Sequence, residues 1–285
     1  MPTVGEALAL ARQHLMSSSE TSALEARVLL SHVVGQSPTW LFAHPEASLT
    51  PEQEAAYQHL IQQRQQGHPV AYLIGRREFY RWEFAVNDHV LIPRPETELL
   101  VEKAVAWLNA RTTPDADLCV VDVGTGSGII AISVALLCPA VTVHATDISP
   151  DALATAQANA QRLGANVHFA QGDLLIPAQA DLIVANLPYI ARDELSALAV
   201  AQFEPHLALD GGPDGLDLIR RLLYQIPQYW RPKGCILLEI GANQGAAVRE
   251  LASNLLGGVT ISLYQDLAGL DRIVEINYDS GDACQ

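Results

Sequence analysis

From residue 117 onward, short apolar runs of strand length alternate with longer segments of helical character. Such alternation predicts a parallel sheet with helices on both faces, because each crossover between parallel strands needs a helix-length connection. Only a short turn separates the last two runs, so they cannot be parallel neighbours. We therefore expect an α/β fold with a mostly parallel sheet and an antiparallel last strand. The expected strands are 118–124, 141–148, 166–173, 181–188, 235–241, 259–267 and 271–278.

Residues 1–70 show a different pattern and are expected to be helical throughout. Apolar residues recur there at helical spacing. This part carries no cluster of reactive side chains, so we expect it to recognise a partner or to support the rest of the chain. Three pairs with the spacing of a capping box precede its helices: Thr3 with Glu6, Ser22 with Glu25, and Thr50 with Gln53.

Residues 71–92 alternate aromatic and β-branched residues with polar ones, which predicts a β-hairpin linker. Asn87 and Asp88 are expected to lie in a turn of this segment. The chain is therefore expected to contain a helical part (1–70), the linker, and an α/β domain (93–285).

The composition argues against several classes of protein. A formal net charge of −15 disfavours a surface that tracks phosphates, because such surfaces need clustered Lys and Arg. Neither Cys-x-x-Cys nor His-Glu-x-x-His occurs, so no metal site is expected. The N-terminus lacks a signal-peptide pattern, and no apolar stretch suits a membrane span. We expect a cytoplasmic protein without membrane contact, with reduced thiols at Cys119, Cys138, Cys235 and Cys284.

A glycine-rich loop, DVGTGSG at 122–128, joins the first expected strand of the sheet to a helix. Glycines let a ligand approach the backbone and the free N–H groups of the helix, although a tight turn has the same composition. Asp147 and Asp173 end the next two strands. Carboxylates there suit ribose hydroxyls and an adenine amino group, although each is also a common helix cap. Polar groups at successive strand ends favour a nucleoside ligand.

Two nucleoside cofactors suit these strand ends. A dinucleotide loop normally reads Gly-x-Gly-x-x-Gly, whereas the spacing here is Gly-x-Gly-x-Gly. Asp122 adds a negative charge that disfavours a phosphate and suits an ammonium or sulfonium group. S-adenosylmethionine carries both of these cations. On these residues the chain resembles the class I S-adenosylmethionine-dependent methyltransferases, and the resemblance implies a Rossmann-like seven-stranded sheet.

Asn186, Leu187, Pro188 and Tyr189 follow the fourth expected strand and offer no strong acid, base or nucleophile. Transfer of a methyl group from a sulfonium needs an aligned lone pair rather than a strong base. The Asn186 side-chain oxygen and the Leu187 carbonyl can hold the two N–H bonds of an amide and orient its nitrogen. Pro188 restricts Leu187 to extended conformations, and Tyr189 offers a ring face. A simple Asn-x-Pro turn remains an alternative.

The motif is similar to the Asn-Pro-Pro-Tyr signature of methyltransferases that act on planar nitrogens, with Leu187 in place of a proline. Together with other segments it resembles the HemK/PrmC family of protein-(glutamine-N5) methyltransferases over nearly the whole chain. That resemblance implies methylation of the glutamine in the Gly-Gly-Gln motif of peptide chain release factors, using S-adenosylmethionine. The other segments are 69–80 (PVAYLIGRREFY), 91–98 (LIPRPETE), 202–209 (QFEPHLAL), 211–216 (GGPDGL) and 266–276 (DLAGLDRIVEI).

The resemblance also implies roles for individual residues. The helical part is expected to recognise the release factor, the segment 91–98 to line the cofactor pocket, and Phe203, Glu204 and Pro205 to brace the site. The expected cofactor-binding residues are Gly124, Thr125, Gly126, Ser127, Gly128, Asp147, Asp173, Leu174 and Asn186. The expected substrate-binding residues are Asn186, Leu187, Pro188 and Tyr189, with Asn186, Pro188 and Tyr189 as catalytic residues.

Three other functions agree less well with these residues. A nucleic-acid adenine-N6 methyltransferase shares the fold and the motif, and the acidic net charge disfavours it. An NAD-dependent oxidoreductase is disfavoured by the loop spacing and by the lack of a placed hydride-transfer partner. A non-catalytic binding module would need the strand-end residues to have lost their roles, although all of them are intact.

Overall fold

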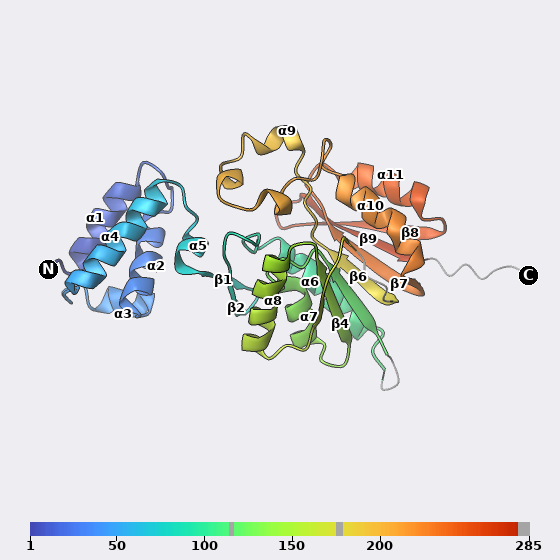
Figure 1. Cartoon of the computed structure of the whole chain (residues 1–285), viewed down its shortest axis with the longest axis horizontal. Coiled ribbons are helices and arrows are strands. Elements are labelled where there is room, and N and C mark those ends of the chain that lie inside the picture. The colour runs from blue at the N-terminus through green and yellow to red at the C-terminus, as the bar shows by residue number, and fades with distance from the viewer. Residues whose placement is uncertain (114–116, 175–178, 279–285) are drawn as a thin grey trace, which may run out of the picture. The chain divides into compact units, whose positions relative to one another are not determined.

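The computed structural model describes residues 1–113, 117–174 and 179–278 (Figure 1). The chain divides into two compact units, Met1–Arg76 and Arg77–Gln285, and each has its own core. The helices of the first unit are α1 (Val4–Leu15), α2 (Ser22–Val34), α3 (Pro38–Ala43), α4 (Pro51–Gln65) and α5 (Val70–Ile74).

The apolar stripes of α1, α2 and α4 face one another and form the core of the first unit. Tyr57 of α4 is buried there, and its hydroxyl donates to the Ala26 carbonyl at 2.9 Å. The pairing removes the cost of burying a phenol. The main core residues are Val4, Ala7, Ala11, Leu15, Ala26, Leu29, Leu30, Leu41, Leu49, Tyr57 and Ile61.

Two of the three expected capping boxes are present, at Thr3 with Glu6 and at Thr50 with Gln53. The box expected between Ser22 and Glu25 is wrong, because Ser22 is already the first residue of α2 and no side chain caps this helix. The Glu25 carboxylate instead accepts hydrogen bonds from Arg64 of α4 at 2.9 and 3.1 Å. A tertiary ion pair has taken the place of a local cap.

A hairpin shorter than the predicted one follows α5. The turn of this hairpin lies at Tyr80, which has a φ of +59°, and the predicted turn at Asn87 and Asp88 is confirmed beyond the hairpin. Asn87 accepts a hydrogen bond from the His89 N–H at 3.0 Å in a separate turn beyond the hairpin. Residues 71–74, predicted to belong to the hairpin, instead continue α5, and Gly75 ends this helix in the left-handed conformation. The strands are β1 (Arg76–Phe79) and β2 (Trp82–Ala85).

The second unit contains a seven-stranded sheet in the order β5-β4-β3-β6-β7-β9-β8. All neighbours are parallel except that β9 is antiparallel to both β7 and β8. The predicted mostly parallel sheet with an antiparallel last strand is confirmed. The strands are β3 (Cys119–Val123), β4 (Thr142–Asp147), β5 (His168–Gln171), β6 (Ala180–Ala185), β7 (Trp230–Glu239), β8 (Val259–Gln265) and β9 (Asp271–Tyr278).

Helices cover both faces of the sheet, as the alternating side chains of β3 illustrate. Val120 packs with α6 and α7 on one face, whereas Val121 and Val123 pack with α10 and α11 on the other. Burial on both faces explains why these strands are continuously apolar. The helices are α6 (Thr97–Asn109), α7 (Ile129–Leu137), α8 (Pro150–Leu163), α9 (Arg192–Leu195), α10 (Asp217–Gln225) and α11 (Gly245–Leu255), with 3-10 turns η1 (Ala199–Gln202), η2 (His206–Ala208) and η3 (Ile226–Gln228).

The strand order reverses at β3, which has β4 on one side and β6 on the other. Connections that leave a parallel sheet in opposite directions open a crevice at the carboxyl ends of the strands. The loop after β3, Asp147 at the end of β4 and Asn186 after β6 all meet at this edge.

The cysteines agree with the expected buried thiols as far as the described ranges extend. Cys119, Cys138 and Cys235 are buried and free. Cys284 lies outside the described residues. None of the helices in the described residues is both long and apolar enough to cross a membrane.

Candidate active site

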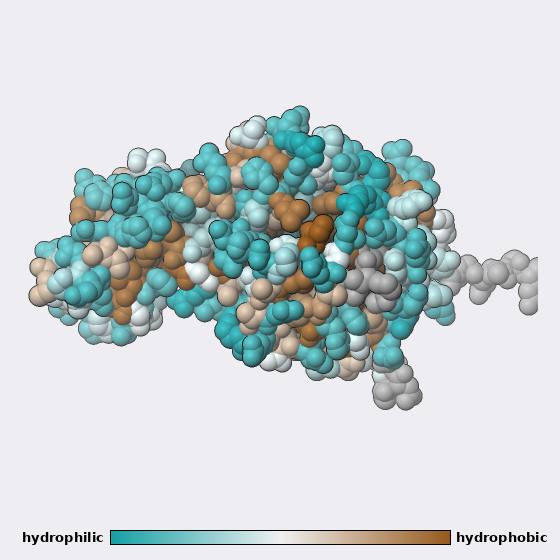
Figure 2. Space-filling model, in the orientation of Figure 1, coloured by the Kyte–Doolittle hydropathy of each residue, from teal (hydrophilic) through white to brown (hydrophobic). Residues whose placement is uncertain are grey.

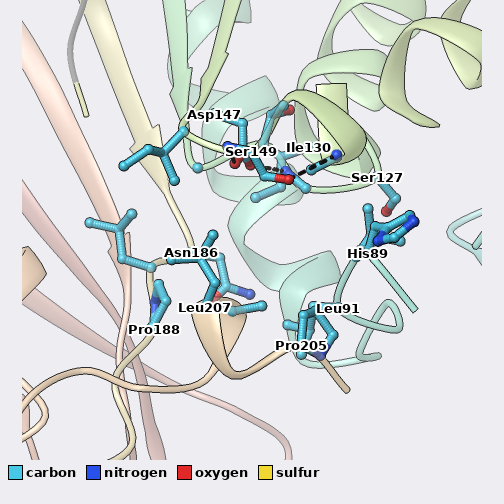
Figure 3. A pocket seen from close by; sticks show the side chains of 18 of the residues that line it. His89, Leu91, Ser127, Ile130, Asp147, Ser149, Asn186, Pro188, Pro205 and Leu207 are labelled. Carbon is cyan, nitrogen blue, oxygen red and sulfur yellow. Dashed lines mark hydrogen bonds between the residues drawn. The ribbon is translucent and has the colours of Figure 1, made fainter. Parts of the chain in front are cut away.

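A cavity of about 290 Å³ opens at the crevice beside β3 (Figure 3). Its walls come from the β3–α7 loop, the ends of β4 and β5, and the loop after β6. Gly128 and Tyr189 were expected at the site but are not among the lining residues. The expected residues that line it are Gly124, Thr125, Gly126, Ser127, Asp147, Asp173, Leu174, Asn186, Leu187 and Pro188.

The glycine loop has a backbone that only glycine adopts easily. Gly124, Gly126 and Gly128 have φ values of +73°, +56° and +85°. A Cβ on Gly124 would stand 2.9 Å from Cδ2 of Leu187, so this glycine lets the loops after β3 and β6 approach each other. Gly128 does not face the cavity and instead begins α7 as its N-cap residue.

Asp122 lies beneath the glycine loop and is completely buried. Its Oδ2 atom accepts hydrogen bonds from the Thr125 hydroxyl at 2.6 Å and the Ala131 N–H at 3.1 Å. Its Oδ1 atom has no hydrogen-bond partner among the described residues. Burial raises the pKa of Asp122 to about 7. The carboxyl therefore organises the loop, and any effect of its charge on a ligand is exerted from behind the pocket wall.

Asp147 fixes the opposite side of the loop. Its Oδ2 atom accepts from the Gly126 N–H and its Oδ1 atom from the Ser149 N–H, both at 2.9 Å. Ser149, rather than Asp147, caps α8 by accepting from the Ala152 N–H at 3.2 Å. Asp147 thus faces the pocket with its rotamer held by two backbone donors (Figure 3).

Asp173 and Leu174 reach the pocket from the end of β5. The Asp173 carboxylate forms an exposed ion pair with Arg221 of α10 at 2.6 Å. Leu174 has a φ of +70°, and its carbonyl accepts from the buried Thr146 hydroxyl at 2.7 Å. This hydrogen bond holds an unfavourable backbone conformation in place.

The loop Asn186–Tyr189 is held from several sides. The Asn186 amide nitrogen donates to the Thr97 hydroxyl of α6 at 3.1 Å. The Tyr189 carbonyl accepts from Gln244 at 2.9 Å, and the Ile190 N–H donates to the Leu209 carbonyl at 3.2 Å. Burial, with a smaller contribution from Glu239, raises the pKa of Tyr189 to about 12, so its phenol stays neutral. The loop therefore presents the Asn186 amide to the cavity on a fixed backbone, and the neutral Tyr189 ring follows it outside the cavity lining.

Buried Glu204 joins two segments that surround the pocket. One of its oxygens accepts from the Ile92 N–H at 3.2 Å, and the other forms an ion pair with Arg94. The segment expected from the resemblance to line the pocket does so at Leu91, Pro93, Arg94 and Thr97.

Several lining residues carried no signal in the sequence. Asp88, His89 and Val90 lie in irregular structure before α6, and Arg221 lies on the polar side of α10, a position that a helical pattern assigns to solvent. Only the tertiary fold brings such positions to the cavity. The unexpected lining residues are Asp88, His89, Val90, Ile129, Ile130, Ile148, Ser149, Ala152, Gly172, Leu207, Ala208, Leu218 and Arg221. Pro205, which the resemblance assigns to bracing the site, also lines the cavity.

Comparisons with known proteins identify the family. Residues 6–75 match the PrmC N-terminal domain family, and residues 101–202 match the family of Ribosomal protein L11 methyltransferase (PrmA). A release factor glutamine methyltransferase from Bordetella pertussis is 47% identical over 255 residues, which cover 88% of this chain and 93% of that protein. A second, from Bacillus subtilis, is 40% identical over 282 residues, or 96% and 97% of the two chains.

The chain belongs to the release factor glutamine methyltransferase family. Among solved structures, a methyltransferase from Pyrococcus furiosus is 16% identical and covers 68% of this chain and 87% of its own, with a TM-score of 0.50. That likeness concerns the fold. The methyltransferase family and fold imply the use of S-adenosylmethionine.

The pocket of this family member fits such a cofactor. The cavity has a volume near the lower end of the range for small-molecule sites. It combines the Asp147 carboxylate with apolar walls at Ile130, Ile148 and Leu174, which suit hydroxyls and a flat ring, respectively. Beneath it lies the Oδ1 atom of Asp122, for which the described residues offer no hydrogen-bond partner. Acidic groups on and behind the wall favour a cationic ligand.

Proposed function

We propose that this chain transfers a methyl group from S-adenosylmethionine to the side-chain amide nitrogen (N5) of the glutamine in the Gly-Gly-Gln motif of peptide chain release factors. The observation that carries the proposal is the fixed Asn186 amide on the wall of the strand-end pocket, with its nitrogen already donating to Thr97. Its Oδ1 atom is then the side-chain atom available to a bound amide. Translation termination takes place in the cytoplasm, where we place the reaction.

The residues of the loop are suited to hold and orient an amide. S-adenosylmethionine supplies an electrophilic methyl group when it is bound. Asn186 Oδ1 and the Leu187 carbonyl accept from the two N–H bonds of the glutamine, which directs the lone pair of the nitrogen away from them. Pro188 keeps the loop rigid, and Tyr189 offers its neutral ring to the planar amide. The amide nitrogen gains the methyl group as the bond from that methyl to sulfur breaks, and the nitrogen then releases one of its two N–H protons to water. Asn186, Pro188 and Tyr189 are thus our proposed catalytic residues, and alignment rather than base strength drives the transfer.

The cofactor is assigned to the glycine loop and the neighbouring strand ends. Asp147 is proposed to accept from the ribose hydroxyls, and Asp173 and Leu174 to meet the adenine. Gly128 contributes through the start of α7, since it does not line the cavity. The full proposed set is Gly124, Thr125, Gly126, Ser127, Gly128, Asp147, Asp173, Leu174 and Asn186.

The helical part, residues 1–70, is proposed to dock the release factor, and residues 93–285 to carry out the reaction. A groove of about 520 Å³ between α1 and α4 supports the first assignment. It is lined by Ala7, Leu10, Ala11, Tyr57 and Ile61, and Leu10 is half exposed. Figure 2 shows hydrophobic residues exposed among hydrophilic ones on this unit.

A direct assay tests the proposed function. The chain is incubated with labelled S-adenosylmethionine and, separately, with purified release factors, tRNA and DNA. We expect label only on the release factors, with one methyl group located by mass spectrometry on the Gly-Gly-Gln glutamine. Label on adenine in nucleic acid would replace the proposal with the adenine-N6 alternative.

Asp147→Ala should weaken S-adenosylmethionine binding because it removes the proposed ribose acceptor. A hydrogen bond to a charged group contributes roughly 1.5–3 kcal/mol, which corresponds to about a 10- to 150-fold rise in Kd. Titration calorimetry measures the change. Asp151→Ala is a matched control, because Asp151 is an exposed carboxylate in the first turn of α8 and does not line the cavity. Equal affinities of the two variants for S-adenosylmethionine would show that Asp147 does not bind the cofactor.

Removing residues 1–76 should leave cofactor affinity nearly unchanged, because every residue lining the pocket belongs to the second unit. Methylation of an intact release factor should fall about tenfold or more, the equivalent of roughly 1.4 kcal/mol of docking free energy. Initial rates at low release-factor concentration give the effect, and calorimetry gives the cofactor affinity. A truncated chain that binds cofactor and methylates the factor at the normal rate would show that the helical unit has another role.

A further inference from the structure

Glu239, the last residue of β7, is a buried carboxyl group that the mechanism above does not use. Its side chain lies behind the pocket wall and is only 2% exposed. The pairing of β6 with β7 places Glu239 next to Asn186, and side-chain hydrogen bonding with Thr97 and Asn186, which both line the cavity, favours the ionised form by lowering the Glu239 pKa against the effect of burial. Its Oε2 atom has no hydrogen-bond partner in the described part of the chain. Burying an unpaired carboxyl oxygen is costly, so the stability of the fold alone does not account for a glutamate here.

The chemistry of the three side chains sets the direction of their hydrogen bonds. An ionised carboxylate only accepts, whereas a hydroxyl both donates and accepts. The Thr97 hydroxyl therefore donates to Glu239 and keeps its lone pairs for the Asn186 amide nitrogen, which lies 3.1 Å away. The carboxylate thus determines which end of the Asn186 amide points inward.

We propose that Glu239 is a positioning residue that, with Thr97, holds the Asn186 side chain with its nitrogen toward the protein and its oxygen toward the substrate amide. The inference rests on the proposed function, since it explains how the acceptor for the glutamine N–H is kept in place. Without the carboxylate, the Thr97 hydroxyl is free to donate to Asn186 Oδ1. The amide then turns over and presents N–H groups to the substrate.

Positively and negatively charged groups both lie near Glu239. Burial is the largest effect and raises the pKa of Glu239 to about 7, while the hydrogen bond from Thr97 and the charge of Arg272 on β9 act in the opposite direction. The nearby Glu96 adds to the increase, and the phenol of Tyr189 is neutral at these pH values. Protonation converts the acceptor-only carboxylate into a group that also donates. The positioning therefore weakens as pH falls and strengthens as pH rises through the neutral range.

Glu239→Gln is the central test, because it preserves shape and removes only the charge. We expect kcat for methylation of a release factor to fall about 10- to 100-fold, the usual effect of a misaligned reacting group. The Kd for S-adenosylmethionine and the KM for the factor should stay within about threefold of wild type, a difference of roughly 0.65 kcal/mol or less. Thr97→Val should reproduce the loss, and Thr97→Ser, which keeps the hydroxyl, should restore most of the activity.

The pH dependence separates positioning from a general loss of structure. At saturating cofactor, kcat/KM for the release factor should rise with pH through the neutral range in the wild type, and this rise should be absent in Glu239→Gln. The double variant Thr97→Val/Glu239→Gln should lose little more than either single variant, because both changes break the same chain of hydrogen bonds. Wild-type kcat in Glu239→Gln, or losses that multiply in the double variant, would overturn the proposal.

An NMR measurement without substrate distinguishes the positioning role of Glu239 from the proposed function. The side-chain NH₂ signals of Asn186, assigned by their absence in Asn186→Asp, should shift with pH in the wild type and lose that titration in Glu239→Gln. A wild-type chain that shows the titration but does not methylate release factors would overturn the proposed function alone. If the wild type is active but the Asn186 signals behave the same in the wild type and in Glu239→Gln, the positioning role alone would be overturned.

Discussion

Asn186→Ala should lower the turnover of release-factor methylation about 100- to 1000-fold while S-adenosylmethionine affinity stays nearly unchanged. The variant removes one of the two acceptors that we assign to the glutamine amide and leaves an N–H unpaired in the closed site. Losses of this size are typical when one preorganised polar group is removed from an active site. The Thr97 hydroxyl, which accepts from the Asn186 nitrogen at 3.1 Å, would also lose this donor.

Two neighbouring substitutions serve as controls for this prediction. Asn186→Asp keeps an oxygen but replaces the amide nitrogen that donates to Thr97, and it adds a charge close to buried Glu239. Turnover should therefore fall as it does in Asn186→Ala. Leu187→Pro should keep most of the activity, because only the backbone carbonyl of this residue is assigned a role. Some stability should be lost, since the Leu187 side chain is buried in the core.

Mass spectrometry of the release factor measures the effect and locates the methyl group, while calorimetry reports cofactor affinity. Full activity in Asn186→Ala would refute the mechanism proposed for residues 186–189. Methylation of a residue type other than glutamine would do the same. A parallel loss of cofactor affinity and turnover would indicate that Asn186 serves the cofactor instead of the substrate.

Gly128→Ala should destabilise the second unit by about 2–5 kcal/mol. The left-handed backbone at Gly128 disfavours any side chain by roughly 1–2 kcal/mol. A Cβ there would also stand 2.7 Å from Ile132 Cδ1 and 3.1 Å from the Ala156 Cβ, and such overpacking costs about 1–3 kcal/mol. The clash lies between α7 and α8, so the substitution disturbs the packing of α7, the helix that begins at the glycine loop.

The same loop supplies a matched control. Gly126 also has a positive φ, but a Cβ added there meets nothing within 4 Å. Gly126→Ala should therefore cost only the backbone strain, about 1–2 kcal/mol. Thermal unfolding compares the two variants, since each kcal/mol lowers Tm by roughly 2–4 °C in a domain of this size. Equal Tm values would show that α7 and α8 readjust without penalty and that packing does not require Gly128.

Local patterns in the sequence predicted much of the fold correctly. Strand-length apolar runs gave the strands of the sheet, and the short turn at 266–270 required β8 and β9 to be antiparallel. Predictions from local sequence patterns were wrong where the tertiary structure brought in other contacts. Glu25 was expected to cap α2, yet its carboxylate accepts a hydrogen bond from Arg64, which is 39 residues away in the chain. Residues 71–74 were predicted to belong to the hairpin, but they form part of a short helix that ends at Gly75.

The sequence by itself determined the glycine loop, the acidic strand ends and the loop Asn186–Tyr189, because each is a short motif whose chemistry follows from adjacent residues. The tertiary structure decided which side chains surround and support them. Thr97 meets Asn186 across 89 residues and Ile92 meets Glu204 across 112. In the sequence, Glu239 is only a polar residue at the end of an apolar strand. Its contact with Asn186 exists because β6 and β7 are neighbours in the sheet, and strand order depends on how helices pack on both faces, which no local pattern encodes.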